Sequence, residues 1–390
     1  MPVNLPGLWL AVFWGAGFLL AYTFGGYAVL MRLLARTRQR PVFPPQEIWP
    51  TVTCVVVAFN EEDRIVTRVG NLLASDYPAE RLRVVVVSDG STDRTVGYLQ
   101  AMSDARVRVI EQPERLGKAS GLNAALAALD SDLVVLTDSR QRFAADTIRR
   151  LAGHFGDPAI GAVSGSLEIE RTASNVGQAV EAYWKHEKEL RAAEARFDSC
   201  IGCTGAVYAL RRSLFVPLPP DTLLDDVVVP MQAARQGYRV LHDPEAIAFD
   251  PQPLDPQLEQ VRKRRTLAGN FQMLFRYPGW LLPWGHRLWW QLISHKYLRL
   301  VLPLLLVAIL VANTQLLGSR FFQATLLLQG IAYTLAGAGL LWPGAKARLL
   351  SLPAGFVFLN IAVVRAFLYY LTAPDLQRWT TQRKEPAASA

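Results

Sequence analysis

The sequence predicts an α/β domain with a mostly parallel sheet, together with transmembrane and interfacial helices. Of the 390 residues 51% are hydrophobic and 19% are charged, so a water-exposed part must accompany a strongly apolar part. Four long segments with almost no charge lie near the two ends of the chain. Between them, short β-branched runs alternate with helical patterns, which is typical of a parallel α/β sheet.

The N-terminal segment, residues 1–31, is predicted to be a transmembrane helix. Residues 3–31 carry no charge and are long enough to cross about 30 Å of hydrocarbon. Four arginines follow this segment, namely Arg32, Arg36, Arg38 and Arg40. Because basic residues stay on the cytoplasmic side, the N-terminus is predicted to lie outside. Residues 32–48 then form a basic, proline-rich linker.

The C-terminal part is predicted to hold three further transmembrane helices within residues 299–373. Uncharged runs cover 300–319 and 321–345, and a third run covers 349–374 with one charge, Arg365. An arginine inside a span either serves a function or reaches the interface by snorkelling. The sequence leaves both readings of Arg365 open.

The segments that flank these spans are more polar. Residues 277–298 are rich in tryptophan with scattered charge, which predicts interfacial amphipathic helices. Residues 374–390 form a polar tail. Four spans place this tail outside, whereas Arg378, Arg383 and Lys384 favour the cytoplasm, so its side stays open.

Residues 49–276 are predicted to form the cytoplasmic α/β domain of an integral protein of the inner or plasma membrane. Continuous apolar runs at 51–58, 82–87 and 133–137 have the pattern of strands that are covered on both faces. Ligands of parallel sheets bind beyond the carboxyl ends of the strands. The polar residues that follow these strands, and so should line one binding edge, are Asn60, Glu61, Asp89 and Asp138.

Cysteine count and net charge exclude several classes of protein. The three cysteines Cys54, Cys200 and Cys203 are too few for a disulfide framework or a four-ligand zinc site. They are expected to be small packing residues of a protein in a reducing compartment. The net charge of +8 lies beside the membrane segments and in one motif rather than on a nucleic-acid-binding module. We therefore expect anionic membrane lipids as partners and no nucleic acid.

Four motifs occur in order at the strand ends: Val57-Ala-Phe-Asn60-Glu61-Glu62, Val87-Ser-Asp89-Gly-Ser-Thr-Asp93, Gly117-Lys118 followed by Asn123, and Thr137-Asp138. Together they resemble family-2 inverting glycosyltransferases of the GT-A fold, over about residues 50 to 275. One span before the domain and several after it are similar to the arrangement in membrane-integrated polysaccharide synthases, such as those of cellulose, hyaluronan and poly-N-acetylglucosamine.

The resemblance implies a nucleotide-sugar donor, with UDP as its nucleotide. Asn60, Glu61 and Asp89 would accept hydrogen bonds from the uracil and ribose, and Lys118 would lie beside the diphosphate as a point charge. An Asx-type turn and helix cap is the structural alternative for Asp89. The family usually has two Asp residues before the Gly, whereas this chain has Ser88 in place of the first.

Asp138 stands at the first position of the family's Asp-x-Asp metal motif. The chain reads Asp138-Ser139-Arg140, so the second carboxylate is replaced by a guanidinium. Two alternatives stay open. In the first, which we favour, Asp138 retains a weaker Mg²⁺ or Mn²⁺ site, completed by water and phosphate oxygens. In the other, Arg140 neutralises the diphosphate directly.

The resemblance makes Asp226 the general base, because the acceptor hydroxyl must lose its proton as it attacks the anomeric carbon. Asp225 would support Asp226, and the alternative is a pair of carboxylates that stabilise a helix N-terminus. Trp184, Thr204 and Gly205 stand where the family builds its acceptor side.

A basic motif with Arg262, Arg264 and Arg265 stands where processive synthases carry Gln-x-x-Arg-Trp. The resemblance implies that these arginines stabilise the departing diphosphate, while a lipid-facing basic patch is the alternative. Thr266 replaces the family's Trp, which seats the acceptor sugar of a growing polymer. This replacement favours the addition of one or a few sugars to a lipid-linked or saccharide acceptor over processive synthesis.

Two other classes of function are weighed against transfer. A nucleotide-sugar sensor without catalysis fits the altered metal motif, but the chain retains Asp226. A transporter is disfavoured because three or four spans are few for a substrate path in one chain. The sequence predicts neither the sugar nor the oligomeric state.

Overall fold

The computed structural model describes residues 5–38, 40, 45–169, 176–250, 256–342 and 348–373, and at 5, 176–185, 256–259 and 348 only their backbone. The chain divides into two compact units, each with its own internal contacts. The sheet unit lies between residues 38 and 254. The helical unit combines the residues up to 37 with those from 256 to 372.

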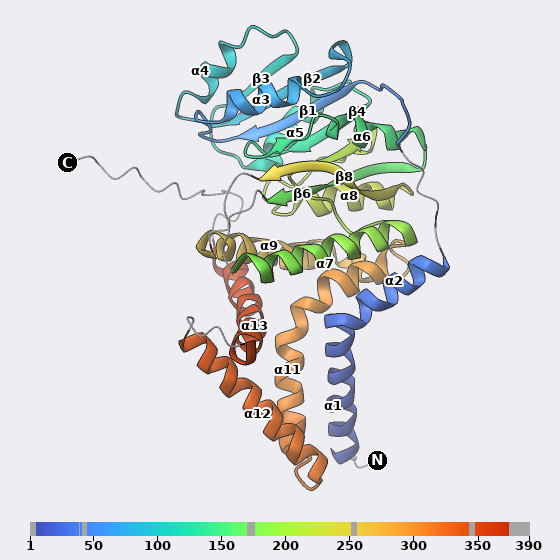
Figure 1. Cartoon of the computed structure of the whole chain (residues 1–390), viewed down its shortest axis with the longest axis vertical. Helices are drawn as coiled ribbons and strands as arrows, with labels where there is room; N and C mark the ends of the chain where they lie inside the picture. Colours follow the sequence, from blue (N-terminus) through green and yellow to red (C-terminus); the bar gives the residue numbers. More distant parts are fainter. Residues whose placement is uncertain are drawn as a thin grey trace, which may run out of the picture. The chain divides into compact units, whose positions relative to one another are not determined.

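The sheet unit is built on a mixed sheet, most of whose strands are labelled in Figure 1. In the described residues the strand order is β3-β2-β1-β4-β7-β6-β8-β5. Its strands are β1 (Val52–Ala58), β2 (Leu82–Asp89), β3 (Val107–Gln112), β4 (Leu133–Thr137), β5 (Arg142–Phe143), β6 (Ile160–Ile169), β7 (Tyr208–Arg211) and β8 (Arg239–Asp250).

The four strands β3, β2, β1 and β4 are parallel to one another. Strand β7 is antiparallel to both β4 and β6, β8 is parallel to β6, and β5 is antiparallel to β8. Ala58 of β1 pairs with Ser88 of β2, and Val56 of β1 pairs with Thr137 of β4. The carboxyl ends of β1, β2 and β4 therefore meet at one edge of the sheet, as the sequence predicted.

Helices cover both faces of the parallel strands, which explains why these strands are apolar throughout. Val55 and Val56 are consecutive in β1 and point to opposite faces, yet both are fully buried. The helices of this unit are α3 (Ile65–Leu73), α4 (Thr95–Gln100), α5 (Lys118–Ala127), α6 (Thr147–Gly153), α7 (Val176–Phe197) and α8 (Asp225–Arg235), with short 3₁₀ turns at Ala79–Arg81, His154–Gly156 and Arg212–Leu214.

Helix α5 packs closely on β1 because Gly121 has no side chain. A Cβ atom at Gly121 would lie 2.7 Å from Cγ1 and 3.0 Å from Cγ2 of Val57. Such distances are shorter than van der Waals contact, so the glycine sets the spacing between helix and strand. Since α5 begins at Lys118, this spacing also positions the Lys118 side chain.

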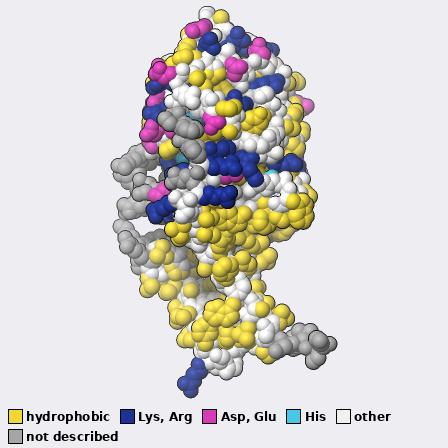
Figure 2. All heavy atoms as spheres, turned by 90° about the vertical axis from the view of Figure 1, so that its right-hand side faces the viewer, with side chains coloured by type: hydrophobic (Ala, Val, Ile, Leu, Met, Phe, Trp, Pro, Cys, Tyr) yellow, Lys and Arg dark blue, Asp and Glu magenta, His cyan; other side chains and the backbone are white. Residues whose placement is uncertain are grey.

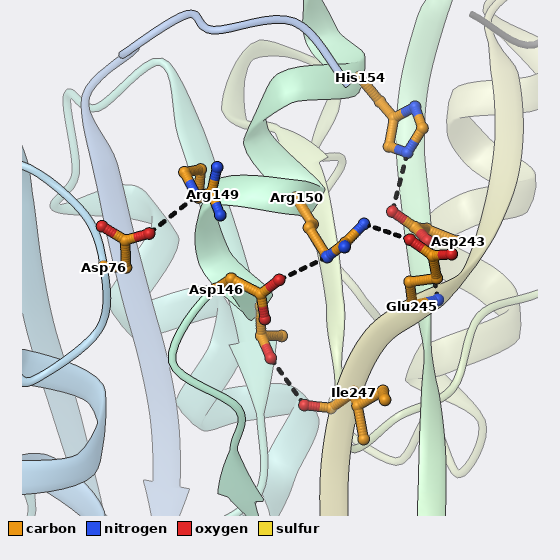
Figure 3. Close-up of polar contacts among 9 residues, drawn as sticks. Asp76, Asp146, Arg149, Arg150, His154, Asp243, Glu245 and Ile247 are labelled. Carbon is orange, nitrogen blue, oxygen red and sulfur yellow. Dashed lines mark hydrogen bonds and ion pairs between the residues drawn. The ribbon is translucent and has the colours of Figure 1, made fainter. Parts of the chain in front are cut away.

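Polar contacts fasten helix α6 to strand β8 (Figure 3). The Arg150 guanidinium lies 2.6 Å from the Asp146 carboxylate and 2.6 Å from that of Glu245. His154 Nε2 lies 3.0 Å from Asp243 Oδ2, and both side chains are buried. This network extends along β8 toward the strand end that belongs to the candidate site.

The helical unit is built from α1 (Leu5–Ala21), α2 (Tyr27–Thr37), α9 (Pro256–Arg276), α10 (Trp289–Leu292), α11 (Leu298–Gln315), α12 (Arg320–Leu341) and α13 (Arg348–Thr372), with a 3₁₀ turn at Pro278–Leu281. Four helices in the described chain are long and apolar enough to cross a membrane, namely Pro6–Thr37, Trp289–Gln315, Arg320–Leu341 and Leu349–Thr372.

Large apolar side chains gather on the face of this unit that Figure 2 shows. Trp14, Phe18, Leu327 and Leu352 each expose more than half of their surface, at 58%, 68%, 66% and 72%. Soluble proteins rarely expose continuous apolar surface of this kind, whereas lipid-facing helices do. Helices α11 and α12 are joined by a polar contact, because Asn313 Nδ2 donates a 3.1 Å hydrogen bond to Gln329 Oε1.

Two of these helices contain a π-helical turn, at Tyr22–Gly26 between α1 and α2 and at Ile293–Tyr297 between α10 and α11. The two turns contact each other, because the Tyr22 hydroxyl lies 2.8 Å from Ser294 Oγ. Trp290 Nε1 also donates a 2.9 Å hydrogen bond to the Tyr22 hydroxyl. Each π turn accommodates an extra residue within an otherwise continuous helix.

Helix α9 falls within the predicted range 49–276, yet it belongs to the helical unit. It packs on α13, where the ring centroids of Phe271 and Phe367 are 4.9 Å apart. The predicted interfacial segment 277–298 contains the turn at Pro278–Leu281 and α10, and it continues through the second π turn into α11. The predicted boundaries of the catalytic domain stay a prediction.

Candidate active site

The loops after β1 and β2 are tied together through Asn60. This residue has a left-handed backbone (φ 53°), which Asn adopts more readily than most residues. Its side-chain Oδ1 accepts a 2.8 Å hydrogen bond from Thr92 N, and its backbone N–H donates to Ser91 Oγ at 3.1 Å. The Asn60 amide therefore shapes the loop that follows β2.

Glu61 and Asp89 have partners within the protein. The Glu61 carboxylate lies 2.9 Å from Arg64 Nε. Asp89 is buried, and its Oδ1 accepts hydrogen bonds from the backbone N–H of Leu116 at 2.7 Å and of Gly117 at 3.0 Å. Asp89 thus holds the loop that enters α5, where Gly117 has a φ of 92° that glycine tolerates best.

Lys118 joins two of the predicted acidic motifs. Its Nζ lies 2.9 Å from Asp138 Oδ1 and 3.2 Å from Asp225 Oδ2. Burial of the ammonium opposes its charged form, but the carboxylates of Asp138, Asp225 and Asp226 outweigh burial and raise the pKa of Lys118. Lys118 is therefore a permanent cation at the carboxyl edge of the sheet.

Asp225 and Asp226 occupy the first turn of α8, where carboxylates stabilise the positive end of the helix dipole. The loop before β7 is fixed against this turn, because Cys203 N donates a 2.7 Å hydrogen bond to the Asp226 carbonyl. A Cβ atom on Gly205 would lie 3.1 Å from Asp226 Oδ2. The glycine therefore leaves space beside the predicted base.

Comparison with known proteins finds relatives of the sheet unit. Residues 53–216, which include β1, β2, α5 and β4, match the family model described as Glycosyl transferase family 2. The match is to a family-2 glycosyltransferase domain and lies within the sheet unit. The predicted resemblance to family-2 glycosyltransferases is thus confirmed for the residues that the family model covers.

Curated relatives of this glycosyltransferase domain include two proteins from Rhizobium. An N-acetylglucosaminyltransferase of Rhizobium sp. (strain N33) is 32% identical over 257 residues, which is 60% of this chain and 56% of the relative. One of Rhizobium meliloti (strain 1021) is 32% identical over 250 residues, 58% of each chain. The chain therefore spans a little over half the length of these relatives.

A solved structure shares the fold over nearly the whole chain. It is the mannosyltransferase PcManGT from Pyrobaculum calidifontis in complex with GDP-Man and Mn²⁺, with a TM-score of 0.68 and 24% identity. The alignment covers 93% of this chain and 99% of the mannosyltransferase. Together with the family match, this likeness confirms the predicted GT-A fold.

Asp138 of the glycosyltransferase domain is supported from behind by a buried arginine. Arg68 Nη2 donates to Thr137 Oγ1 at 2.6 Å, and its Nε donates to the Asp138 carbonyl at 3.2 Å. Burial lowers the pKa of Arg68 to about 10, although nearby Asp138 favours the charged form. Arg68 lies in α3, and nothing in its sequence pattern distinguishes it from an ordinary surface arginine of a helix.

Arg140 is paired with a residue that sequence reasoning missed. Its Nε and Nη2 lie 3.1 Å and 2.7 Å from the two carboxylate oxygens of Asp250, at the end of β8. Both side chains are largely buried. The position of Asp250 at a strand end is the one signal that could have marked it, but the chain order gave no indication that β8 lies near the Asp138 loop.

The predicted divalent ion fits these residues poorly. Carboxylates usually supply most of the protein ligands of Mg²⁺ or Mn²⁺. In the described part of the chain, no three His, Cys, Asp or Glu side chains are grouped as a metal site. Asp138 is bound to the Lys118 ammonium, and the motif's second carboxylate is replaced by Arg140, which is paired with Asp250.

On the predicted acceptor side, Thr204 is held in place from two directions. Its backbone N–H donates to Ser164 Oγ at 2.9 Å, and its Oγ1 accepts a 3.0 Å hydrogen bond from Arg191 of α7. Trp184 also belongs to α7, but its side chain is outside the described part. Thr204 and Gly205 belong to the loop that Cys203 fastens to the Asp226 carbonyl.

The predicted arginine cluster, Arg262, Arg264 and Arg265, lies in α9 of the helical unit. Within that unit, the Arg264 guanidinium lies 4.7 Å from the centroid of the Tyr369 ring in α13. This is a favourable cation–π distance. The role of the cluster at the leaving group stays a prediction.

All three cysteines of the glycosyltransferase domain are buried thiols. Burial raises the pKa of Cys54 to about 12. Such thiols are chemically inert at neutral pH, because only the thiolate is reactive.

Proposed function

We propose that this protein transfers a sugar from a nucleotide-sugar donor to a lipid-linked or saccharide acceptor at a membrane, with inversion at the anomeric carbon. The family of its domain supports a donor of this class. The relatives named N-acetylglucosaminyltransferase make UDP-N-acetylglucosamine the first donor to test.

The contact of Lys118 with both Asp138 and Asp225 carries the proposal. It brings the strand-end motif and the α8 motif into one site at the edge where ligands of such sheets bind. At this edge the Lys118 ammonium binds the diphosphate of the donor, and carboxylates activate the nucleophile.

Asp226 acts as the general base in this proposal. Its carboxylate takes the proton of the acceptor hydroxyl while the hydroxyl oxygen bonds to the anomeric carbon. The bond between that carbon and the diphosphate oxygen breaks at the same time, and its electron pair leaves with the nucleoside diphosphate. Gly205 leaves space beside Asp226 for the acceptor hydroxyl.

Arginine and lysine side chains supply the positive charge that stabilises the leaving group. Lys118 lies at the carboxyl edge, and we assign Arg262, Arg264 and Arg265 to the departing diphosphate. Preorganised cations that face a developing negative charge lower the barrier to its departure. Asn60, Glu61 and Asp89 form the nucleoside side of the site, partly through the loops that they hold.

The proposed location at a membrane is supported by the four helices that are long and apolar enough to span a bilayer. We place the catalytic domain in the cytoplasm, where nucleotide sugars are made, and the acceptor at the membrane surface. Thr266, in place of a tryptophan, favours the addition of one or a few sugars.

Transfer by purified protein tests this function. Asp226→Asn should abolish sugar transfer while UDP binding stays within about twofold of the wild type, a difference that calorimetry resolves. Asp130→Asn is the matched control, because Asp130 is almost fully exposed in a loop that precedes β4. Transfer by Asp226→Asn at the wild-type rate would exclude Asp226 as the base.

Product length separates the two forms of transfer. Radiolabelled donor should give an acceptor extended by one or a few sugars on a gel. A long polymer made by the purified wild-type protein would instead identify a processive synthase.

A further inference from the structure

Two cations stand at the edge of the sheet where the Asp138 motif lies. Lys118 is bound to Asp138 and Asp225, and Arg140 is bound to Asp250. Both cations belong to the sheet unit, and both stay partly accessible, with 24% of the Lys118 side chain and 18% of the Arg140 side chain exposed. Their carboxylate partners Asp225 and Asp250 are more deeply buried, at 7% and 5%.

The pair with Asp250 orients Arg140 and leaves part of it available. Nε and Nη2 face the two oxygens of Asp250, which is the side-on bidentate geometry of a carboxylate pair. In the described part of the chain, Arg140 makes its hydrogen bonds through Nε and Nη2 and none through Nη1. A guanidinium held in this way offers its remaining N–H groups to a second anion without losing the first.

The charge at position 140 matches what a divalent ion would bring. An aspartate there would contribute −1 and Arg140 contributes +1, a change of +2 in formal charge. One Mg²⁺ or Mn²⁺ ion also contributes +2. The side chains therefore deliver the same charge to this edge without an ion.

We propose that the donor diphosphate binds to Lys118 and Arg140 and needs no divalent metal ion. This inference rests on the proposed nucleotide-sugar transfer and deepens it. Asp138 then acts as the partner that positions the Lys118 ammonium, and Arg68 fixes the Asp138 backbone from behind. The expectation of a retained Mg²⁺ or Mn²⁺ site gives way in this proposal to a pair of fixed cations.

Nucleotide binding to the purified full-length protein tests the inference without relying on turnover. The Kd for UDP should agree within about twofold between buffer with excess EDTA and buffer with Mn²⁺. A loss of affinity of about tenfold or more in EDTA would overturn the inference.

A carboxylate restored at position 140 should make UDP binding depend on a metal ion. Arg140→Asp recreates the Asp-x-Asp spacing and leaves Asp250 as a third carboxylate nearby. UDP binding by this variant should weaken at least about tenfold in EDTA and recover with Mn²⁺. Arg142→Asp is the control, because it makes the same charge change two residues away, in β5, on an exposed side chain over Phe249. Mn²⁺ should not alter UDP binding by the control.

A second variant covers the case in which Arg140→Asp fails to fold. Arg140→Gln with Asp250→Asn removes both charges of the buried pair, so neither is left without its partner. Its UDP affinity should fall by about tenfold in EDTA and in Mn²⁺ alike. Wild-type affinity in this double variant would overturn the role of Arg140.

The outcomes separate this inference from the proposed function. If the wild-type protein bound no nucleoside diphosphate in either buffer, both would fail. If it bound UDP equally in both buffers but Asp226→Asn retained full transfer, the general base would be wrong and the metal-free site would stand.

Discussion

At the scale of single residues, Lys118 determines how the site is put together. Its ammonium is shared by a strand-end carboxylate, Asp138, and a helix-start carboxylate, Asp225. Buried ion pairs add little net stability, but removal of one partner leaves an uncompensated charge behind. Lys118 therefore links the stability of the sheet unit to the binding of nucleotide, and the two effects can be separated.

Lys118→Met should lower both stability and nucleotide binding. The buried Asp225 carboxylate loses its counter-ion, so we expect a loss of about 3 kcal/mol in the free energy of unfolding. Adding Asp225→Asn should restore much of the stability, whereas UDP binding should stay weak. Chemical unfolding and calorimetry in detergent measure the two quantities, and equal stability of the single variant and wild type would contradict the role of this contact.

The sequence predicted which residues gather at the sheet edge, but not what they touch. Asn60, Asp89 and Asp138 follow predicted strands, and parallel pairing alone brings them together. The partners Arg68 and Asp250 could not be predicted, because each reaches the site through packing of an element distant in the chain. Long-range side-chain pairing leaves no local pattern in a single sequence.

At the scale of elements, the contact between α5 and β1 fixes where the Lys118 end of the helix lies. Only a residue without a side chain fits at position 121. The sequence pattern predicted both the strand and the helix, but it did not show that their spacing depends on one glycine.

Gly121→Ala should destabilise the sheet unit by about 1–3 kcal/mol, because the new methyl group overlaps Val57. Gly97→Ala in α4 is the matched control, since a Cβ there meets nothing within 4 Å. The control should be neutral or stabilising by up to about 1 kcal/mol, because alanine favours helix over glycine. Equal melting temperatures of the two variants would contradict the proposed close contact.

The network between α6 and β8 predicts a pH dependence. Burial favours the neutral form of Asp243, but its hydrogen bonds to His154 and Glu245 N and nearby positive charges outweigh burial and lower its pKa below 3.8. The folded state therefore gains stability from ionised Asp243 at any pH above the unfolded pKa. That stability is lost as the pH falls through the folded pKa.

Thermal unfolding between pH 6 and pH 3 should thus show a steeper acid decline for wild type than for Asp243→Asn, which cannot titrate at this position. Glu245→Gln is the comparison, because its carboxylate is largely exposed and a surface ion pair contributes little. Parallel acid curves for wild type and Asp243→Asn would argue against this stabilising ionisation.

At the scale of the whole molecule, the many apolar residues lie in two separate places. One part fills the buried strands, and the other covers the outside of the helices. The periodicity and length of the apolar runs predicted this division well, since lipid-facing helices are apolar all round. The sequence could not show to which unit α9 belongs, because a charged amphipathic helix has the same pattern whether it packs on a sheet or on other helices.

The buried cysteines allow a direct test of the proposed membrane topology. Native thiols should not react with an impermeant maleimide, so a cysteine introduced at a chosen site reports its own accessibility. Gly318→Cys, in the connection between α11 and α12, should be labelled in intact cells. Asp130→Cys should be labelled only after the cells are opened, and the reverse pattern would invert the topology.

The paired π turns have a consequence for how this chain can diverge. Each turn holds an extra residue, and removal of that residue rotates the rest of the helix by about 100°. Loss of one turn alone would therefore carry Tyr22 away from Ser294, while loss of both would rotate the two helices together. Among homologous sequences, single-residue gaps inside the first span should accompany gaps near the start of the second, as a pair of deletions separated by some 270 positions of chain.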